Sequence, residues 1–172
     1  MPPKTRTTTQ SPAERARARQ RPVLKMTICD DVAVKAALDL AQHTVRRAKA
    51  EAADRPGDRV IAEAVSLAQK ELEAAQAAFD AEAYDLRFQA LPRKDFEALK
   101  KAHPPTEAQA EDGFEVNINT FAPELIAAAS LDGLTVDDAR SFLEDWAEGE
   151  ANTLFTTAWT VQQETRTDVG KG

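Results

Sequence analysis

Apolar residues recur at two different spacings along this chain, and these spacings divide it into helices and strands. Between residues 33 and 82, small and apolar side chains follow a four-three repeat that a Pro-Gly segment at 54–58 interrupts. The two seams are Val34, Leu38, Ala41, Val45, Ala48 and Ala52, then Ile61, Val65, Ala68, Leu72, Ala75 and Phe79. This pattern predicts an antiparallel helical hairpin. Because Ala buries little area, we expect the hairpin to be the least stable part of the fold.

Two short stretches alternate with a period of two and predict strands. One runs from Val23 to Cys29, and the other runs from Leu86 to Leu91. The first stretch ends at Asp30 and Asp31, which we interpret as helix caps and not as catalytic acids. The two strands flank the hairpin and can pair with each other. Since a two-stranded ribbon is marginal alone, we expect it to pack on the downstream unit.

Downstream of the second strand the pattern predicts four more helices. The first starts at Arg93 and ends before Pro104, with His103 at its C-terminal end facing the helix dipole. After an acidic linker, three helices follow, one of which starts with a capping-box-like sequence at Thr135. A break is expected at Gly149. This region holds the densest set of aromatic residues and should form the main core.

The expected fold is therefore mainly α with a minor two-stranded β element, a helical hairpin plus a small C-terminal helical unit. Its predicted parts are a disordered basic arm (1–22), a strand–hairpin–strand–helix segment (23–103), an acidic linker (104–113), a small helical domain (114–164) and a flexible tail (165–172).

Charge is distributed unevenly over the 172 residues, whose formal net charge is −7. Residues 1–25 carry seven basic residues and one acidic residue, a net of +6, so the rest carries −13. Such an arm attracts anionic partners through screened, non-specific forces. Because it has no aromatic residue to stack on bases, we interpret it as a solvated tail and expect no nucleic-acid partner.

Composition offers little support for catalysis or for a cofactor. A single cysteine, Cys29, excludes an internal disulfide and fits a reducing compartment. The histidines His43 and His103 have no metal-ligand spacing, and no phosphate loop or nucleophile elbow is present. We therefore expect no enzyme, no metal and no cofactor. The sequence contains no apolar run long enough to cross a membrane, and we place the chain in the cytoplasm of the cell that makes it.

Protein binding through aromatic residues is the better hypothesis for function. Helices that carry Trp146 and Trp159 could present a groove to a partner segment. The competing interpretation is that each tryptophan is buried in the core and unavailable to a partner. For each tryptophan considered by itself, we favour this second interpretation. The candidate partner-binding residues are Phe88, Phe96, Phe142, Trp146, Phe155 and Trp159.

Several short motifs occur in a particular order. Residues 86–96 read LRFQALPRKDF and run into HPPTE at 103–107; TFAPELI at 120–126 precedes a Leu-Thr helix start, an acidic helix with Trp146 and a last helix with Trp159. Over roughly residues 23–163 this order resembles the tail assembly chaperones of long-tailed, siphovirus-type phages, particularly those of actinobacterial hosts.

The resemblance implies a chaperone that binds the tape measure protein, assists assembly of the tail tube protein around it and is absent from the mature virion. It places the chain in the host bacterial cytoplasm. Apart from the resemblance, we also leave self-association open. The resemblance also implies a minor product made by programmed frameshifting, for which Val169, Gly170 and Lys171 permit a slippery codon sequence. The alternatives are a structural virion component, such as a head–tail connector or tail-completion protein, and a cytoplasmic coiled-coil adaptor that tethers nucleic acid through its basic arm.

Overall fold

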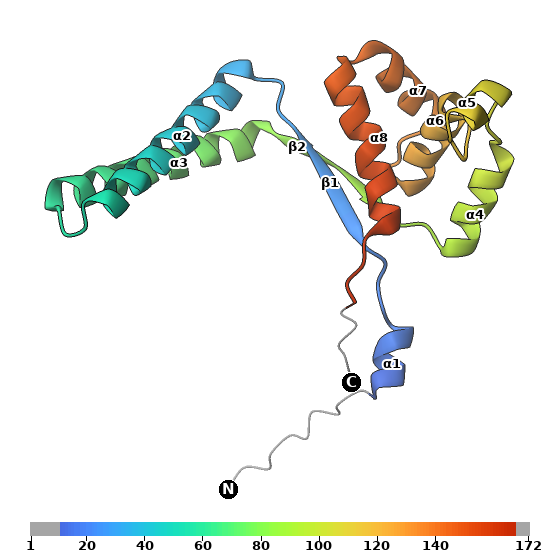
Figure 1. The fold of residues 1–172 in the computed structure, drawn as a ribbon, viewed down its shortest axis with the longest axis horizontal. Helices are drawn as coiled ribbons and strands as arrows, with labels where there is room; N and C mark the ends of the chain where they lie inside the picture. The colour runs from blue at the N-terminus through green and yellow to red at the C-terminus, as the bar shows by residue number, and fades with distance from the viewer. Residues whose placement is uncertain (1–10, 168–172) are drawn as a thin grey trace, which may run out of the picture. The chain divides into compact units, whose positions relative to one another are not determined.

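In the computed structural model, which describes residues 11–167, the fold is mainly α with a minor antiparallel sheet of two strands, as the sequence predicted. Figure 1 shows the elements of this part of the chain. In chain order they are α1 Pro12–Arg17, β1 Val23–Ile28, α2 Val32–Asp54, α3 Arg59–Glu82, β2 Tyr84–Gln89, α4 Arg93–Ala102, α5 Glu107–Glu111, α6 Ile118–Ala129, α7 Val136–Asp145 and α8 Glu148–Gln163.

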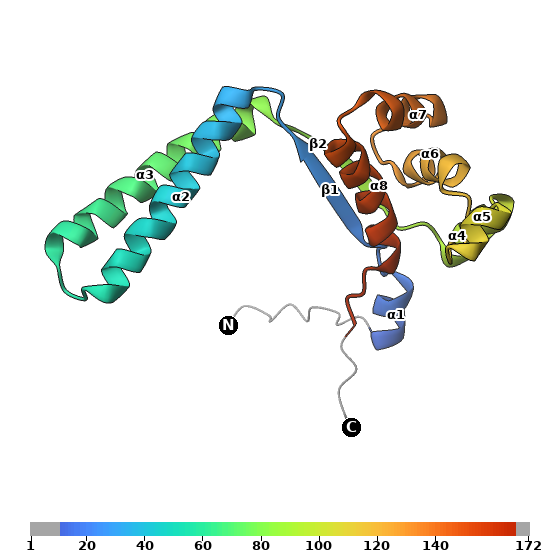
Figure 2. The same cartoon turned by 45° about the horizontal axis from the view of Figure 1, so that its top comes forward.

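Residues 25–86 form one compact unit, which is built around the helical hairpin of α2 and α3. Figure 2 shows the two helices side by side. Each begins at an aspartate whose carboxylate accepts backbone N–H groups of the first turn: Asp31 caps α2 and Asp58 caps α3. Gly57, at φ +90°, allows the turn between them. The predicted hairpin and the capping role of Asp31 are confirmed.

The hairpin's interior combines three larger aliphatic side chains with alanines. The residues that are buried between α2 and α3 belong to the two seams of the four-three repeat: Leu38, Ala41, Val45, Ile61 and Ala68. Alanines let the two helices approach closely, but each buries little apolar area. The hairpin therefore has a thin core.

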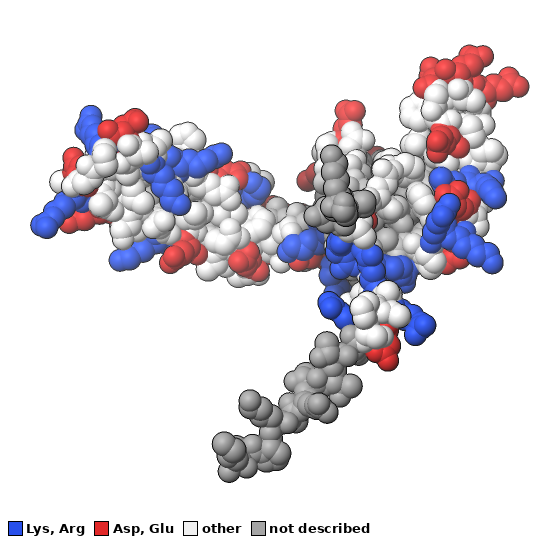
Figure 3. Space-filling view, turned by 60° about the horizontal axis from the view of Figure 1, so that its bottom comes forward, with Lys and Arg blue, Asp and Glu red and all other residues white. Residues whose placement is uncertain are grey.

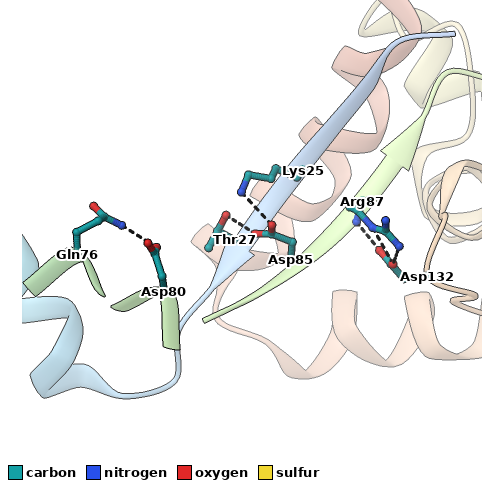
Figure 4. A network of polar contacts seen from close by, with 7 residues as sticks. All are labelled: Lys25, Thr27, Gln76, Asp80, Asp85, Arg87 and Asp132. Carbon is teal, nitrogen blue, oxygen red and sulfur yellow. Dashed lines mark hydrogen bonds and ion pairs between the residues drawn. The ribbon is translucent and has the colours of Figure 1, made fainter. Parts of the chain in front are cut away.

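The sheet joins β1 to β2, as predicted. Near its hairpin end, Asp85 of β2 accepts hydrogen bonds from Lys25 Nζ at 2.9 Å and from Thr27 Oγ1 at 2.6 Å (Figure 4). At its other end, the Ala90 N–H donates to the Pro22 carbonyl at 3.0 Å, and Arg21 donates to the Ala90 carbonyl at 2.7 Å. Polar contacts thus fix the register of the ribbon at both ends.

A second compact unit comprises residues up to 24 together with residues from 87 onward. All the largest fully buried side chains in the described part of the chain belong to this unit: Phe88, Phe121, Leu125, Ile126, Leu154 and Val161. The prediction that the main core lies in the aromatic-rich C-terminal region is confirmed. In addition, Phe88 of β2 contributes a ring to it.

The end of β2 is tied to the loop that follows α6. Phe88 forms an antiparallel bridge with Ser130, and the Leu131 N–H donates to the Arg87 carbonyl at 2.9 Å. Asp132 accepts three hydrogen bonds from Arg87, from the backbone N–H at 2.6 Å, from Nε at 3.0 Å and from Nη2 at 2.6 Å (Figure 4). Residues 87 and 88, at the end of β2, are therefore part of the second unit and are bonded within it.

The structure differs from the sequence-based expectation at two short segments. Within the expected disordered arm, α1 forms behind a capping box in which Ser11 and Glu14 bond each other's backbone N–H groups. Within the expected acidic linker, Thr106 and Gln109 make the same motif and start α5. Both helices are too short to show a 3.6-residue periodicity, and neither contains a buried residue.

Two boundaries also differ. Helix α4, which the sequence-based division groups with the hairpin, belongs to the same unit as α6, α7 and α8. Helix α8 begins at Glu148, so the break lies at Trp146 and Ala147 and Gly149 is helical. None of the helices within residues 11–167 is long and apolar enough to span a membrane.

Candidate partner-binding groove

Most of the aromatic residues that the sequence singled out come together on the unit that contains α4 and α6–α8. Phe88 lies in the core with 0% exposure, so its ring is not available to a partner. The other five are half-buried: Phe96, Phe142, Trp146, Phe155 and Trp159. The interpretation that we favoured for each tryptophan, burial in the core, holds only in part, because both residues have intermediate exposure.

Trp146 and Phe155 line a hollow of about 570 Å³ between α6, α7 and α8. Its wall is formed by apolar residues of all three helices, together with Arg140, Glu144 and Glu148. The apolar lining residues are Ile118, Ala122, Pro123, Leu143, Trp146, Ala151 and Phe155. A hollow of this size accommodates a few apolar side chains of a partner.

A second hollow, of about 390 Å³, adjoins the first. It is lined by Trp159, by Phe114 and Val116 from the segment before α6, and by Ile118 and Phe155, which also line the first hollow. The two hollows thus adjoin at these shared residues, and we call them together the aromatic groove. Phe114 is 48% exposed at its edge. No periodic pattern in the sequence indicates Phe114, because it precedes the helix instead of lying within it.

Trp159 is held in place by three other aromatic rings. Its ring centroid lies 5.8 Å from that of Phe96, 5.9 Å from that of Phe121 and 6.1 Å from that of Phe155. The contacts with Phe96 and Phe121 are edge-to-face, the arrangement that aromatic quadrupoles favour. Phe96 thus contacts the groove residue Trp159 but does not itself line either hollow.

Trp146 is oriented by a different contact. It is the C-cap residue of α7, has extended backbone angles and lies at the corner between α7 and α8. There it stacks on Phe142, with the ring centroids 4.6 Å apart and an angle of 16° between the planes. A rigid, partly exposed tryptophan loses little conformational entropy when a partner covers it.

The polar part of the groove is mainly acidic. Glu144 and Glu148 lie in the first hollow and Glu115 lies in the second, while Arg140 is engaged by Asp137 at 2.8 Å. Pro123, inside α6, has no N–H, so the carbonyl of Asn119 lacks its usual intrahelical donor. Both residues line the first hollow. The groove therefore offers apolar surface and negative charge to a ligand.

Basic side chains gather elsewhere on the same unit. Figure 3 shows Lys and Arg over α1 and over the neighbouring surface. Arg15, Arg17 and Arg19 are exposed, whereas Arg166 donates a hydrogen bond to the Gln20 carbonyl. The described part of the arm is thus attached to the unit by hydrogen bonds at its end, and its helix displays arginines to solvent.

Local capping explains the paired carboxylates at the start of α7. The Thr135 hydroxyl donates to Asp138 at 2.6 Å and the Thr135 N–H donates at 2.9 Å, and these bonds hold the pKa of Asp138 below its ordinary value. Within residues 11–167, no group of three or more His, Cys, Asp or Glu side chains is arranged to hold a metal ion.

The candidate frameshift residues Val169, Gly170 and Lys171 lie outside the described residues. Comparison with known proteins gives no match to this chain among protein-family models, curated proteins or solved structures. The geometry of the aromatic groove is therefore the main structural guide to function.

Proposed function

We propose that this chain is a non-enzymatic phage tail assembly chaperone that binds a segment of the tape measure protein in the aromatic groove. The observation that carries the proposal is that Trp146, Phe155 and Trp159, singled out from sequence as partner-binding residues, line two adjoining hollows of one unit. The sequence resemblance supplies the identity of the partner.

The lining of the groove defines the segment that it binds. Two hollows that share Phe155 suit two apolar anchors on one face of a helix, a recurring mode of peptide recognition. Glu144, Glu148 and Glu115 favour a Lys or Arg beside these anchors. The ligand is accordingly an amphipathic segment with a basic flank. Covering the apolar face of such a segment keeps a long, aggregation-prone protein soluble until tail tube subunits assemble around it.

Co-expression with the tape measure protein encoded in the same phage genome tests this function. We expect the chain to increase the soluble fraction of the tape measure protein and to elute with it during size-exclusion chromatography. Trp146→Ala and Phe155→Ala should each weaken the complex by roughly tenfold or more, because central aromatic anchors dominate interface energy. Leu131→Ala is the matched control, since Leu131 is exposed but does not line the groove.

Purified virions distinguish the chaperone from a structural component. A chaperone is absent from the mature particle and acts in the host cytoplasm, whereas a connector or tail-completion protein persists in stoichiometric amounts. Detection of the chain in virions by mass spectrometry, together with an unchanged solubility of the tape measure protein, would refute the chaperone function. Salt-sensitive DNA binding that disappears when residues 1–22 are removed would instead favour the nucleic-acid-tethering adaptor.

The longer product is tested by expressing the gene with its own downstream DNA. We expect a minor species that extends beyond residues 169–171 into another frame. Intact-mass measurement identifies the junction. The 172-residue product alone would remove frameshifting from the proposal and leave groove binding to be decided by co-expression.

A further inference from the structure

The hairpin presents a second apolar seam on its outside. The residues that immediately precede the inner-seam residues form a second series with the four-three spacing. In α3 these residues are exposed and apolar except Glu71, and in α2 they are exposed and apolar over the first half of the helix. These outer residues are Ala33, Ala37 and Leu40 of α2 and Val60, Ala64, Leu67, Ala74 and Ala78 of α3. Leu40 is 67% exposed, Leu67 60% and Val60 75%. An apolar stripe this wide is typical of helices in bundles of more than two, because one partner helix covers only a single seam.

The outer residues of the two helices lie on the same side of the hairpin. Each outer position precedes an inner position by one residue, so each is rotated by about 100° in the same sense about its own axis. Because α2 and α3 are antiparallel and face each other, equal rotations turn both outer seams toward one common face. We call this the outer face.

The opposite side of the hairpin has a different character. It carries side-chain pairs at i, i+4 spacing, including Lys35 with Asp39 at 2.5 Å and Gln76 with Asp80 at 2.8 Å (Figure 4 for the second pair). Solvent-facing surfaces usually bear such pairs. The apolar character of the outer face is therefore not a general consequence of an Ala-rich hairpin, since only one side has it.

We propose that the outer face binds the outer face of a second copy of this chain, so that two hairpins form a four-helix bundle. The first reason is charge complementarity. Three charged residues lie on the outer face: Arg47 and Glu51 of α2 and Glu71 of α3. Glu51 already pairs with Arg55 at 4.0 Å, which leaves the base Arg47 and the acid Glu71. Neither makes an ion pair within residues 11–167.

A two-fold arrangement that stacks α2 of each copy on α3 of the other brings these charges together. Since α2 ends at Asp54 and α3 begins at Arg59, residues whose numbers sum to about 113 share a level along the hairpin. Glu71 is then level with residue 42, about 8 Å along the axis from Arg47 of the other copy at 1.5 Å per residue. Extended Arg and Glu side chains span that distance, and symmetry makes the pair twice.

The same stacking matches large residues with small ones. Leu40 of one copy is level with residue 73 of the other copy and lies beside its Ala74. The small alanine side chain leaves room for the leucine side chain. Leu67 comes level with residue 46, where the aliphatic stem of Arg47 covers it. Both contacts occur twice under the two-fold axis.

The size of the outer face also suits a copy of itself. Helices of 23 and 24 residues are about 35 Å long, and two helices side by side are about 18 Å wide. This footprint of about 600 Å² approaches the roughly 800 Å² per partner that specific interfaces bury. The proposal is independent of the aromatic groove, which belongs to the other unit.

Sedimentation equilibrium of the full chain over a range of concentrations tests the proposal. We expect a reversible monomer–dimer equilibrium. Leu40→Glu should raise the dimer dissociation constant by roughly 30-fold or more, because it places a charge in the middle of the contact. The control is Gln69→Glu, which adds the same charge at an exposed position on the polar side of α3 and should leave the constant unchanged.

A charge exchange tests the arrangement itself. Arg47→Glu and Glu71→Arg should each weaken the dimer when studied alone, because like charges then face each other. Mixing the two variants should restore a mixed dimer, since every facing pair is again opposite. Far-UV circular dichroism confirms that each variant keeps its helices. A wild-type chain that stays monomeric at all concentrations, or a mixture of the two variants that fails to associate, would overturn the proposal.

Discussion

Replacing Phe88 with Ala distinguishes a core role for this residue from the partner-binding role that its sequence context suggested. Phe88 is 0% exposed, so the substitution removes a complete buried ring. Losing such a ring costs about 3–5 kcal/mol. The bridge to Ser130 holds the strand in place and limits collapse of the cavity, which favours the upper part of this range. Domains are stable by only about 5–15 kcal/mol, so the loss is a large fraction of the total.

Urea denaturation followed by tryptophan fluorescence measures this effect, because Trp146 and Trp159 belong to the same unit as Phe88. With a slope of about 2 kcal/mol per molar urea, the midpoint should fall by about 2 M. The control is Phe114→Ala, which removes a ring that is 48% exposed and should cost about 1 kcal/mol or less. Equal shifts for the two variants would refute the assignment of Phe88 to the core.

Three further predictions concern single residues of the unit that contains Phe88. Asp132→Asn should destabilise it by about 1 kcal/mol, since Arg87 loses its charged acceptor, and high salt should reduce the difference in urea midpoint between wild type and variant. Gly133→Ala should lower the free energy of unfolding by about 1 kcal/mol in the same assay, because residue 133 has a φ of +79°. No atom lies within 4 Å of the added Cβ, so the backbone angle is the only cause, and an unchanged urea midpoint would contradict this argument. In NMR titration, Thr135→Ala should raise the depressed pKa of Asp138. In the wild type, the stabilisation by this carboxylate is complete above the unfolded pKa of about 4 and is lost as pH falls through the lower folded value.

Periodicity predicted the long elements because burial imposes it on them. The seams of the hairpin and the alternation around Phe88 both reflect one buried side, and the structure buries those sides. Capping could be predicted as well: Asp31 and Thr135 act where their sequence context indicated. Short helices such as α1 and α5 have no buried side and therefore leave no periodic pattern.

Contacts between residues far apart in the sequence could not be predicted from the sequence pattern. Arg87 and Asp132 are separated by 45 residues, and nothing local to either residue indicates their pairing. The hydrophobic character of Phe88 did not show whether its ring faces a partner or the core. The aromatic groove was predicted in part, because Trp146, Phe155 and Trp159 were recognised as a set, but the contribution of Phe114 and Pro123 depends on how separate segments meet.

The order of elements around the sheet has a consequence for how this chain could change in evolution. Strands β1 and β2 pair directly, so the roughly 55 residues between them act as the loop of a β-hairpin. Loop closure becomes only about 0.6 kcal/mol more costly with each doubling of length. Whole heptads can therefore be added to or deleted from α2 and α3 in matched pairs while the strands keep their register. The length of the helical hairpin can therefore change without a change in the strand pairing.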